Sequence, residues 1–168
     1  GSVTTTGAQS YGETVSVSFG VDTTLTGSMV TFNAPVSGAG YLHVVGDATL
    51  NGGSITTVGE QSYSGAVTLT TDTVLDAGAA DVTLSSTVDG LYSLEIRSAG
   101  VTTLGGAVGA THALTSLTTN AGGTLVIDGG SVTTTGAQSY GETVSVSLGV
   151  DTTLTGSMVT FNAPVSGA

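Results

Sequence analysis

A long, almost identical internal repeat constrains the fold more than any other feature of this sequence. Residues Gly1–Ala39 recur as Gly130–Ala168, and the two copies differ at one position, where Leu148 replaces Phe19. The offset of 129 residues indicates an architecture in which each unit packs on its neighbours along one axis. We therefore predict a single continuous array over 1–168, with one full unit (1–129) and part of a second copy (130–168), taken from a longer array.

A shorter repeat lies inside the long one. The tripeptide Gln-Ser-Tyr occurs at 9–11, 61–63 and 138–140, at spacings of 52 and 77 residues, so that sub-repeats begin near Val3, Ile55 and Val132. The difference between these spacings is about half of 52, and one fifth of 129 is close to the same value. This arithmetic predicts a structural coil of about 26 residues and six to seven coils in the chain.

The residues within each predicted coil favour short β-strands. Val, Leu and Ile alternate with Thr and Ser in runs such as Thr14–Ser18, Ala66–Thr70 and Ser131–Thr135, and this period of two is the strand signal. Gly and Asp residues separate the runs, and no stretch has the apolar stripe of a helix. Three strands and three turns per coil predict an all-β parallel β-helix (β-solenoid). A two-sheet sandwich would also explain the alternation, but not the fixed short period.

The charge excludes several classes of function. The chain has 12 acidic residues and one basic residue, Arg97, for a formal net charge of -11. A chain with one cation cannot neutralise a run of phosphates, so we expect no nucleic-acid binding and no docking on anionic lipid. The 168 residues contain no Cys, no apolar run long enough to span a membrane and no signal-peptide pattern at Gly1. We expect any export signal to lie outside this sequence.

The sequence offers few candidates for chemistry, and we predict no catalytic or cofactor-binding residue. Arg97 is the only side chain that could hold the carboxylates of a uronate polymer, and we expect it to pair with Glu95 or a neighbouring acid. His43 and His112 stand apart from any cluster with metal-ligand spacing. Weak calcium candidates form the densest acidic stretch, for which turn capping is the simpler explanation: Asp72, Asp76, Asp81 and Asp89.

Two further features have structural and functional interpretations. Ice-binding solenoids present Thr-x-Thr pairs on one face, and this chain has such pairs at 24–26, 68–70 and 71–73, but their spacing does not match one coil. The recurring tyrosines Tyr11, Tyr63 and Tyr140 are expected to pack at a coil corner rather than to stack on sugars.

Three segments resemble the repeats of filamentous-haemagglutinin-like surface proteins, a group of giant bacterial adhesins secreted by two-partner or autotransporter routes. These segments are 131–140, 67–75 and 104–109, and the resemblance extends over essentially the whole chain. It implies an exported, right-handed parallel β-helix shaft at the bacterial cell surface that holds adhesive regions away from the cell. Its motifs report a scaffold rather than an activity.

Together these features predict a non-enzymatic structural segment of a bacterial surface adhesin or extracellular filament. The expected partners are further copies of the same repeat, joined covalently or by end-to-end stacking of coils, and a host-cell or surface glycan bound elsewhere in the full protein. Two versions stay open: one covalent shaft, or separate chains that stack into a fibre.

Overall fold

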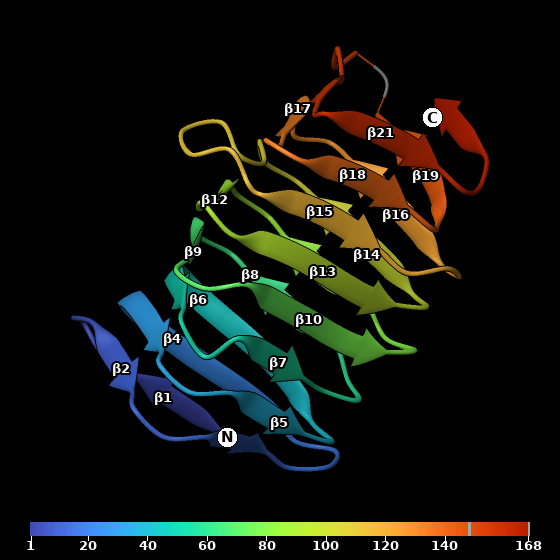
Figure 1. Ribbon diagram of the computed structural model, residues 1–168. Helices are drawn as coiled ribbons and strands as arrows, with labels where there is room; N and C mark the ends of the chain where they lie inside the picture. Colours follow the sequence, from blue (N-terminus) through green and yellow to red (C-terminus); the bar gives the residue numbers. More distant parts are fainter. Residues whose placement is uncertain (148, 168) are drawn as a thin grey trace.

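A computed structural model describes residues 1–147 and 149–167, which form one continuous stack of short β-strands (Figure 1). The strands among the described residues are β1 (Ser2–Thr4), β2 (Gln9–Tyr11), β3 (Val15–Val17), β4 (Asp22–Phe32), β5 (Val36–Gly38), β6 (Tyr41–Leu50), β7 (Ser54–Thr56), β8 (Gln61–Tyr63), β9 (Val67–Leu69), β10 (Thr73–Gly78), β11 (Val82–Leu84), β12 (Val88–Asp89), β13 (Ser93–Ser98), β14 (Val101–Leu104), β15 (Ser116–Thr119), β16 (Thr124–Ile127), β17 (Ser131–Thr133), β18 (Ala137–Tyr140), β19 (Thr143–Val146), β20 (Thr153–Thr155), β21 (Met158–Phe161) and β22 (Val165–Gly167).

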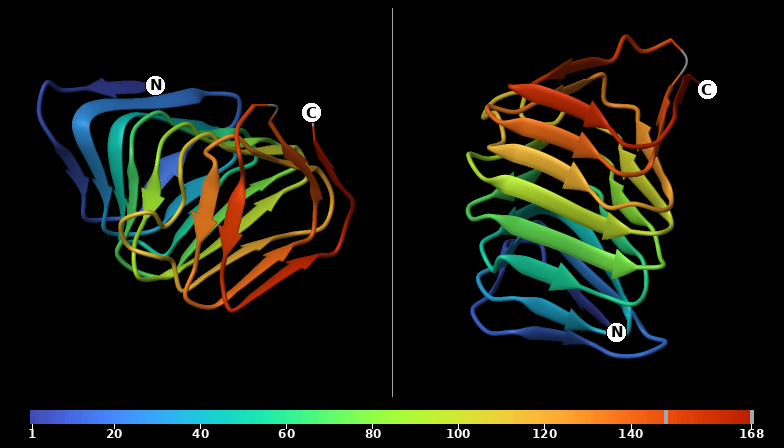
Figure 2. Two further views of the ribbon diagram at one scale, coloured as in Figure 1. Left: turned by 90° about the horizontal axis from the view of Figure 1, so that it is seen from above. Right: turned by 45° about the vertical axis from the view of Figure 1, so that its right-hand side comes forward.

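The strands form three faces, and every strand pairing is parallel (Figure 2). Face 1 contains β1, the first halves of β4 and β6, and then β8, β11, β14, β16, β19 and β22. Face 2 contains β2, the second halves of β4 and β6, and then β9, β12, the bridging residue Val108, β17 and β20. Face 3 contains β3, β5, β7, β10, β13, β15, β18 and β21. The predicted parallel β-solenoid with three short strands per coil is therefore confirmed.

The predicted coil length is wrong. Neighbouring coils are offset by about 21 residues rather than 26, and the chain makes about eight turns rather than six to seven. The reason is that the sequence repeats are made of whole strands and not of whole coils. The three Gln-Ser-Tyr strands lie on three different faces: β2 on face 2, β8 on face 1 and β18 on face 3.

The long repeat shows the same property. Its first strand, β1, lies on face 1 in coil 1, whereas the equivalent strand of the second copy, β17, lies on face 2 in coil 7. The 129-residue repeat thus spans six coils and one further strand, and the second copy is turned by one face relative to the first. The sub-repeats that begin near Val3, Ile55 and Val132 start on β1, β7 and β17, which are again three different faces.

The interior of the coil is a continuous apolar stack. Alternate residues of each strand point inward, as in β16, where Leu125 and Ile127 are fully buried and the residues between them are partly exposed. The inward rows consist mainly of Val, Leu and Ile, with Tyr63 and Tyr140 as the largest fully buried side chains. Each coil contributes a thin slice of this core, so its stability depends on the coils above and below it.

Glycine allows the closest approach of neighbouring coils at some corners. Gly46 has a φ of 116°, and a Cβ atom placed on it would lie 1.9 Å from the carbonyl oxygen of Gly27 in the preceding coil. An L-amino acid with a side chain is therefore excluded there both by conformation and by space.

A buried glutamine links successive coils where Gln-Ser-Tyr occurs. The Gln61 Nε2 donates hydrogen bonds to the carbonyl oxygen of Ile55 (3.0 Å), to the Thr57 hydroxyl (3.1 Å) and to the carbonyl oxygen of Asp76 in the next coil (2.9 Å). The Tyr63 hydroxyl donates to Gln61 Oε1 (3.2 Å), and burial raises the pKa of Tyr63, which keeps the hydroxyl protonated. Gln9 and Gln138 make the equivalent bonds, so one local motif fits all three faces.

Candidate functional site

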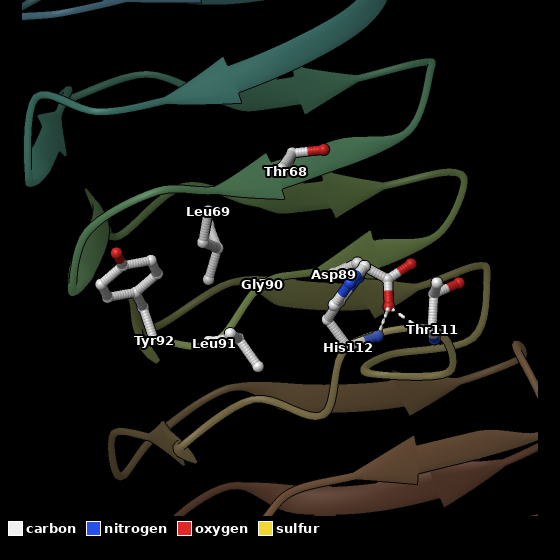
Figure 3. A pocket seen from close by; sticks show the side chains of 8 residues that line it. All are labelled: Thr68, Leu69, Asp89, Gly90, Leu91, Tyr92, Thr111 and His112. Atoms are coloured by element: carbon white, nitrogen blue, oxygen red, sulfur yellow. Dashed lines mark hydrogen bonds between the residues drawn. The ribbon is translucent and has the colours of Figure 1, made fainter.

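A surface pocket with a volume of about 410 Å³ lies at the corner between faces 2 and 3 (Figure 3). Its lining residues come from β9, from β12 and the corner that follows it, and from the loop after Val108: Thr68, Leu69, Asp89, Gly90, Leu91, Tyr92, Thr111 and His112. That loop has seven residues (109–115) before β15, whereas the preceding coil makes the same corner with three (90–92). The extra residues widen the corner and form one wall of the pocket.

The pocket has two chemically different ends. Tyr92, Leu91 and Leu69 lie at one end, and Asp89, His112 and Thr111 lie at the other (Figure 3). Leu91 is 65% exposed and Tyr92 is 39% exposed, so the apolar end presents side chains of a kind that is usually buried.

Asp89 holds the acidic end in place. Its Oδ1 accepts hydrogen bonds from the backbone N–H groups of Thr111 (2.8 Å) and His112 (3.0 Å). Its Oδ2 accepts no hydrogen bond from the described residues. The carboxylate therefore anchors the loop with one oxygen and leaves the other available at the pocket.

Gly90 keeps the floor of the pocket open. Its φ is 147°, and a Cβ atom placed on it would lie 2.5 Å from the carbonyl oxygen of Leu69. Any larger residue would displace the corner onto the pocket floor. The backbone N–H of Gly90 donates to the carbonyl oxygen of His112 (3.2 Å), which ties the floor to the opposite wall.

The other three calcium candidates occupy separate corners. Asp72 Oδ1 accepts from the backbone N–H of Ser93 (2.9 Å), and Asp81 Oδ1 accepts from that of Val101 (2.7 Å). Both bonds join one coil to the next, and the bond from Ser93 lowers the pKa of Asp72. Asp76 Oδ1 accepts from Gly78 N–H (3.0 Å) in its own turn.

The structure does not bring these aspartates together. Within residues 1–147 and 149–167, no group of three or more His, Asp or Glu side chains is placed to hold a metal ion. The geometry is that of turn capping, the simpler of the two explanations, and each aspartate satisfies a backbone donor that a corner leaves without a strand partner.

The remaining charged candidates are dispersed over the surface. Arg97 Nε donates to Glu95 Oε1 (2.7 Å), and Arg97 Nη1 lies 3.9 Å from Asp76 Oδ2, so the expected pairing with Glu95 is confirmed. His43 lies on face 1, half-buried, in register with Thr24 and Ser62 of the neighbouring coils. His112, by contrast, lines the pocket.

The three Thr-x-Thr pairs do not form one array. Thr24 and Thr26 lie on face 1, the pair at 68–70 begins on face 2, and Thr73 of the third pair is buried. The tyrosines were expected at coil corners, but Tyr63 and Tyr140 lie on strands and are wholly buried. Their hydroxyls are bonded to glutamine and are not available to sugars.

The sequence gave no warning of a buried carboxyl at Glu142. This residue is 1% exposed; its Oε1 lies 3.5 Å from the hydroxyl of Thr102, two coils earlier, and its Oε2 has no hydrogen-bond partner. Burial raises the pKa of Glu142 to about 7. The equivalent residue of the first copy, Glu13, is exposed because no coil precedes it, so only the position in the stack distinguishes the two.

Comparison with known proteins does not place the chain in a group: no protein family, curated protein or solved structure matches it. The described residues contain no helix that is long and apolar enough to cross a membrane.

Proposed function

We propose that this chain is a non-enzymatic shaft segment of a bacterial cell-surface adhesin or extracellular filament, and that its partners are further copies of the same repeat. The solenoid supports this proposal because its core and its backbone hydrogen bonds both run along one axis and can be extended without limit. The export, the surface location and the adhesive regions of the full protein belong to the proposal, and they rest on the resemblance of the sequence to filamentous-haemagglutinin-like repeats.

One observation carries the proposal: identical residues are buried in one copy and exposed in the other. Phe32 is 1% exposed and Val36 is fully buried, whereas the equivalent Phe161 and Val165 are 40% and 50% exposed. In the first copy, the coil of residues 40–57 lies on this surface. Complete burial of one such side chain contributes about 1.5–3 kcal/mol. The surface formed by 150–167 therefore has the shape and the apolar side chains to take another coil.

An extended chain tests this proposal. The sequence of residues 40–57 is added after Ala168, and Phe161→Trp provides a single tryptophan in a chain that otherwise has none. We expect the extension to shift the tryptophan emission to shorter wavelengths and to raise the thermal unfolding midpoint. An extension of the same composition in scrambled order is the control. Equal emission from both extended chains would contradict the proposed continuation of the stack.

Stacking of separate chains is a second candidate, because the strands of the first coil also have a free edge. Val3 is 46% exposed, whereas its equivalent Val132 is fully buried beneath β20. Electron microscopy of the purified chain separates the two versions: short discrete rods contradict stacking, and long fibres of uniform width contradict a purely covalent shaft. Antibodies against the repeat, applied to intact source cells, test the surface location, which a lack of staining would refute.

A further inference from the structure

The pocket between faces 2 and 3 combines features that a turn does not need. Leu91 and Tyr92 expose apolar surface at one end, and the Asp89 carboxylate presents a free oxygen at the other (Figure 3). The volume of about 410 Å³ falls within the range of small-ligand sites. A molecule that matches the pocket needs an apolar stem and a polar head at opposite ends.

Charge decides what the head must be. Neither Lys nor Arg lines the pocket, and the chain as a whole carries a formal net charge of -11. A negative potential over the whole surface repels anions and attracts cations to concave sites. A second carboxylate or a phosphate would therefore meet repulsion at Asp89, whereas an ammonium group would gain a charge-assisted hydrogen bond.

We propose that this pocket binds an alkylammonium group. The aliphatic stem packs on Leu69 and Leu91 beside the ring of Tyr92, and the ammonium nitrogen donates to Asp89 Oδ2. The hydroxyls of Thr68 and Thr111 lie on the pocket wall and can accept its remaining protons. The chemistry is shared by free polyamines and by lysine side chains of a partner protein. The proposal does not rest on the role of the chain as a shaft.

The test is a titration followed by backbone amide chemical shifts in NMR, for which a 16.2 kDa chain is suitable. The probe is hexylammonium, and hexan-1-ol is its uncharged counterpart of equal stem length. We expect hexylammonium to shift the amides of residues 89–92 and 109–113, with an affinity about tenfold or more above that of hexan-1-ol and with weaker binding at high salt.

Two matched variants isolate the carboxylate. Asp89→Asn retains an Oδ1 acceptor for the two loop N–H groups but removes the charge, and it should weaken hexylammonium binding about tenfold. Asp72→Asn makes the same change at another corner, where Oδ1 also accepts a backbone N–H, and it should have no effect. Leu91→Ser should weaken both probes, because the stem loses its contact.

The outcomes are decisive. Equal affinity for hexan-1-ol would show that the pocket selects only apolar stems, and equal losses in Asp89→Asn and Asp72→Asn would show non-specific cation binding; either result overturns the proposal. So would the absence of any shift at residues 89–92. Spermidine and a lysine-containing peptide, titrated in parallel, identify the source: tighter binding of spermidine indicates a free polyamine, and tighter binding of the peptide indicates a protein partner.

Discussion

Replacement of the buried glutamine in the middle of the stack tests the mechanism that joins successive coils. Gln61→Met keeps approximately the shape of the side chain and removes its polar atoms. Three hydrogen bonds from Nε2 are lost, and Tyr63 loses the acceptor for its hydroxyl. The carbonyl oxygen of Asp76 keeps one partner, because it also accepts from the backbone N–H of Thr57 (2.8 Å).

The magnitude follows from these partners. A hydroxyl left buried without a partner costs about 1–3 kcal/mol, and a hydrogen bond lost from a group that keeps another partner costs about 0.5–1.5 kcal/mol. We therefore expect Gln61→Met to lower the free energy of unfolding by about 3 kcal/mol. Tyr63→Phe in the same chain removes the orphaned hydroxyl and should restore about 1–2 kcal/mol.

Equilibrium unfolding in urea, followed by circular dichroism, measures these differences. The matched control is Gln9→Met, which breaks the same set of bonds in the first coil, where Gln9 is 7% exposed and water can replace the lost partners. We expect it to cost less than half as much as Gln61→Met. Equal losses at the two positions, or a loss below about 1 kcal/mol at Gln61, would refute the argument that burial gives these bonds their value.

Three further predictions concern the carboxyl, a glycine and the single basic residue. Glu142 favours its neutral form in the folded chain, so stability is lost as the pH rises from about 4.5 through its folded pKa of about 7; Glu142→Gln should be more stable than the parent by about 3 kcal/mol at pH 8 and by little at pH 4, whereas Glu13→Gln, measured by the same urea titrations, should show no such pH dependence. Gly46→Ala should destabilise the chain by more than about 1 kcal/mol in thermal unfolding, and Gly12→Ala, where a Cβ atom meets nothing within 4 Å, should change it by less than about 0.5 kcal/mol; similar effects would show that the corner relaxes. Trypsin should leave the native chain intact and cut the urea-unfolded chain once, after Arg97, because this residue lies within β13 in the middle of face 3; rapid cleavage of the native chain, seen on a gel, would show that this face opens.

The sequence was sufficient to predict the parallel solenoid, because the alternation of Val and Thr is local and each strand obeys it. It was not sufficient to predict the coil length. The Gln-Ser-Tyr spacing counts strands, and a sequence does not show on which face a strand falls. Tyr11 and Tyr63 belong to equivalent segments, yet they lie on faces 2 and 1. Dividing the spacing into whole coils therefore placed each predicted coil out of phase with the real one.

The candidate site depended on the same missing information. Asp89 stood out from its acidic neighbours only as a weak metal candidate, and nothing local connected it with Leu91, Tyr92 and His112. The connection appears once coils of about 21 residues place the loop after Val108 beside the corner after β12. Burial of Glu142 was equally hidden, because the identical sequence around Glu13 is solvent-exposed.

The displacement of the second copy by one face has a genetic consequence. A duplication or deletion in a gene for such a rod need not preserve whole coils, because Gln9, Gln61 and Gln138 show that one segment forms the same corner on any side. Unequal recombination can add or remove any whole number of strands and still leave a chain that folds. The length of the rod can therefore vary between related strains in steps of one strand, about a third of a coil.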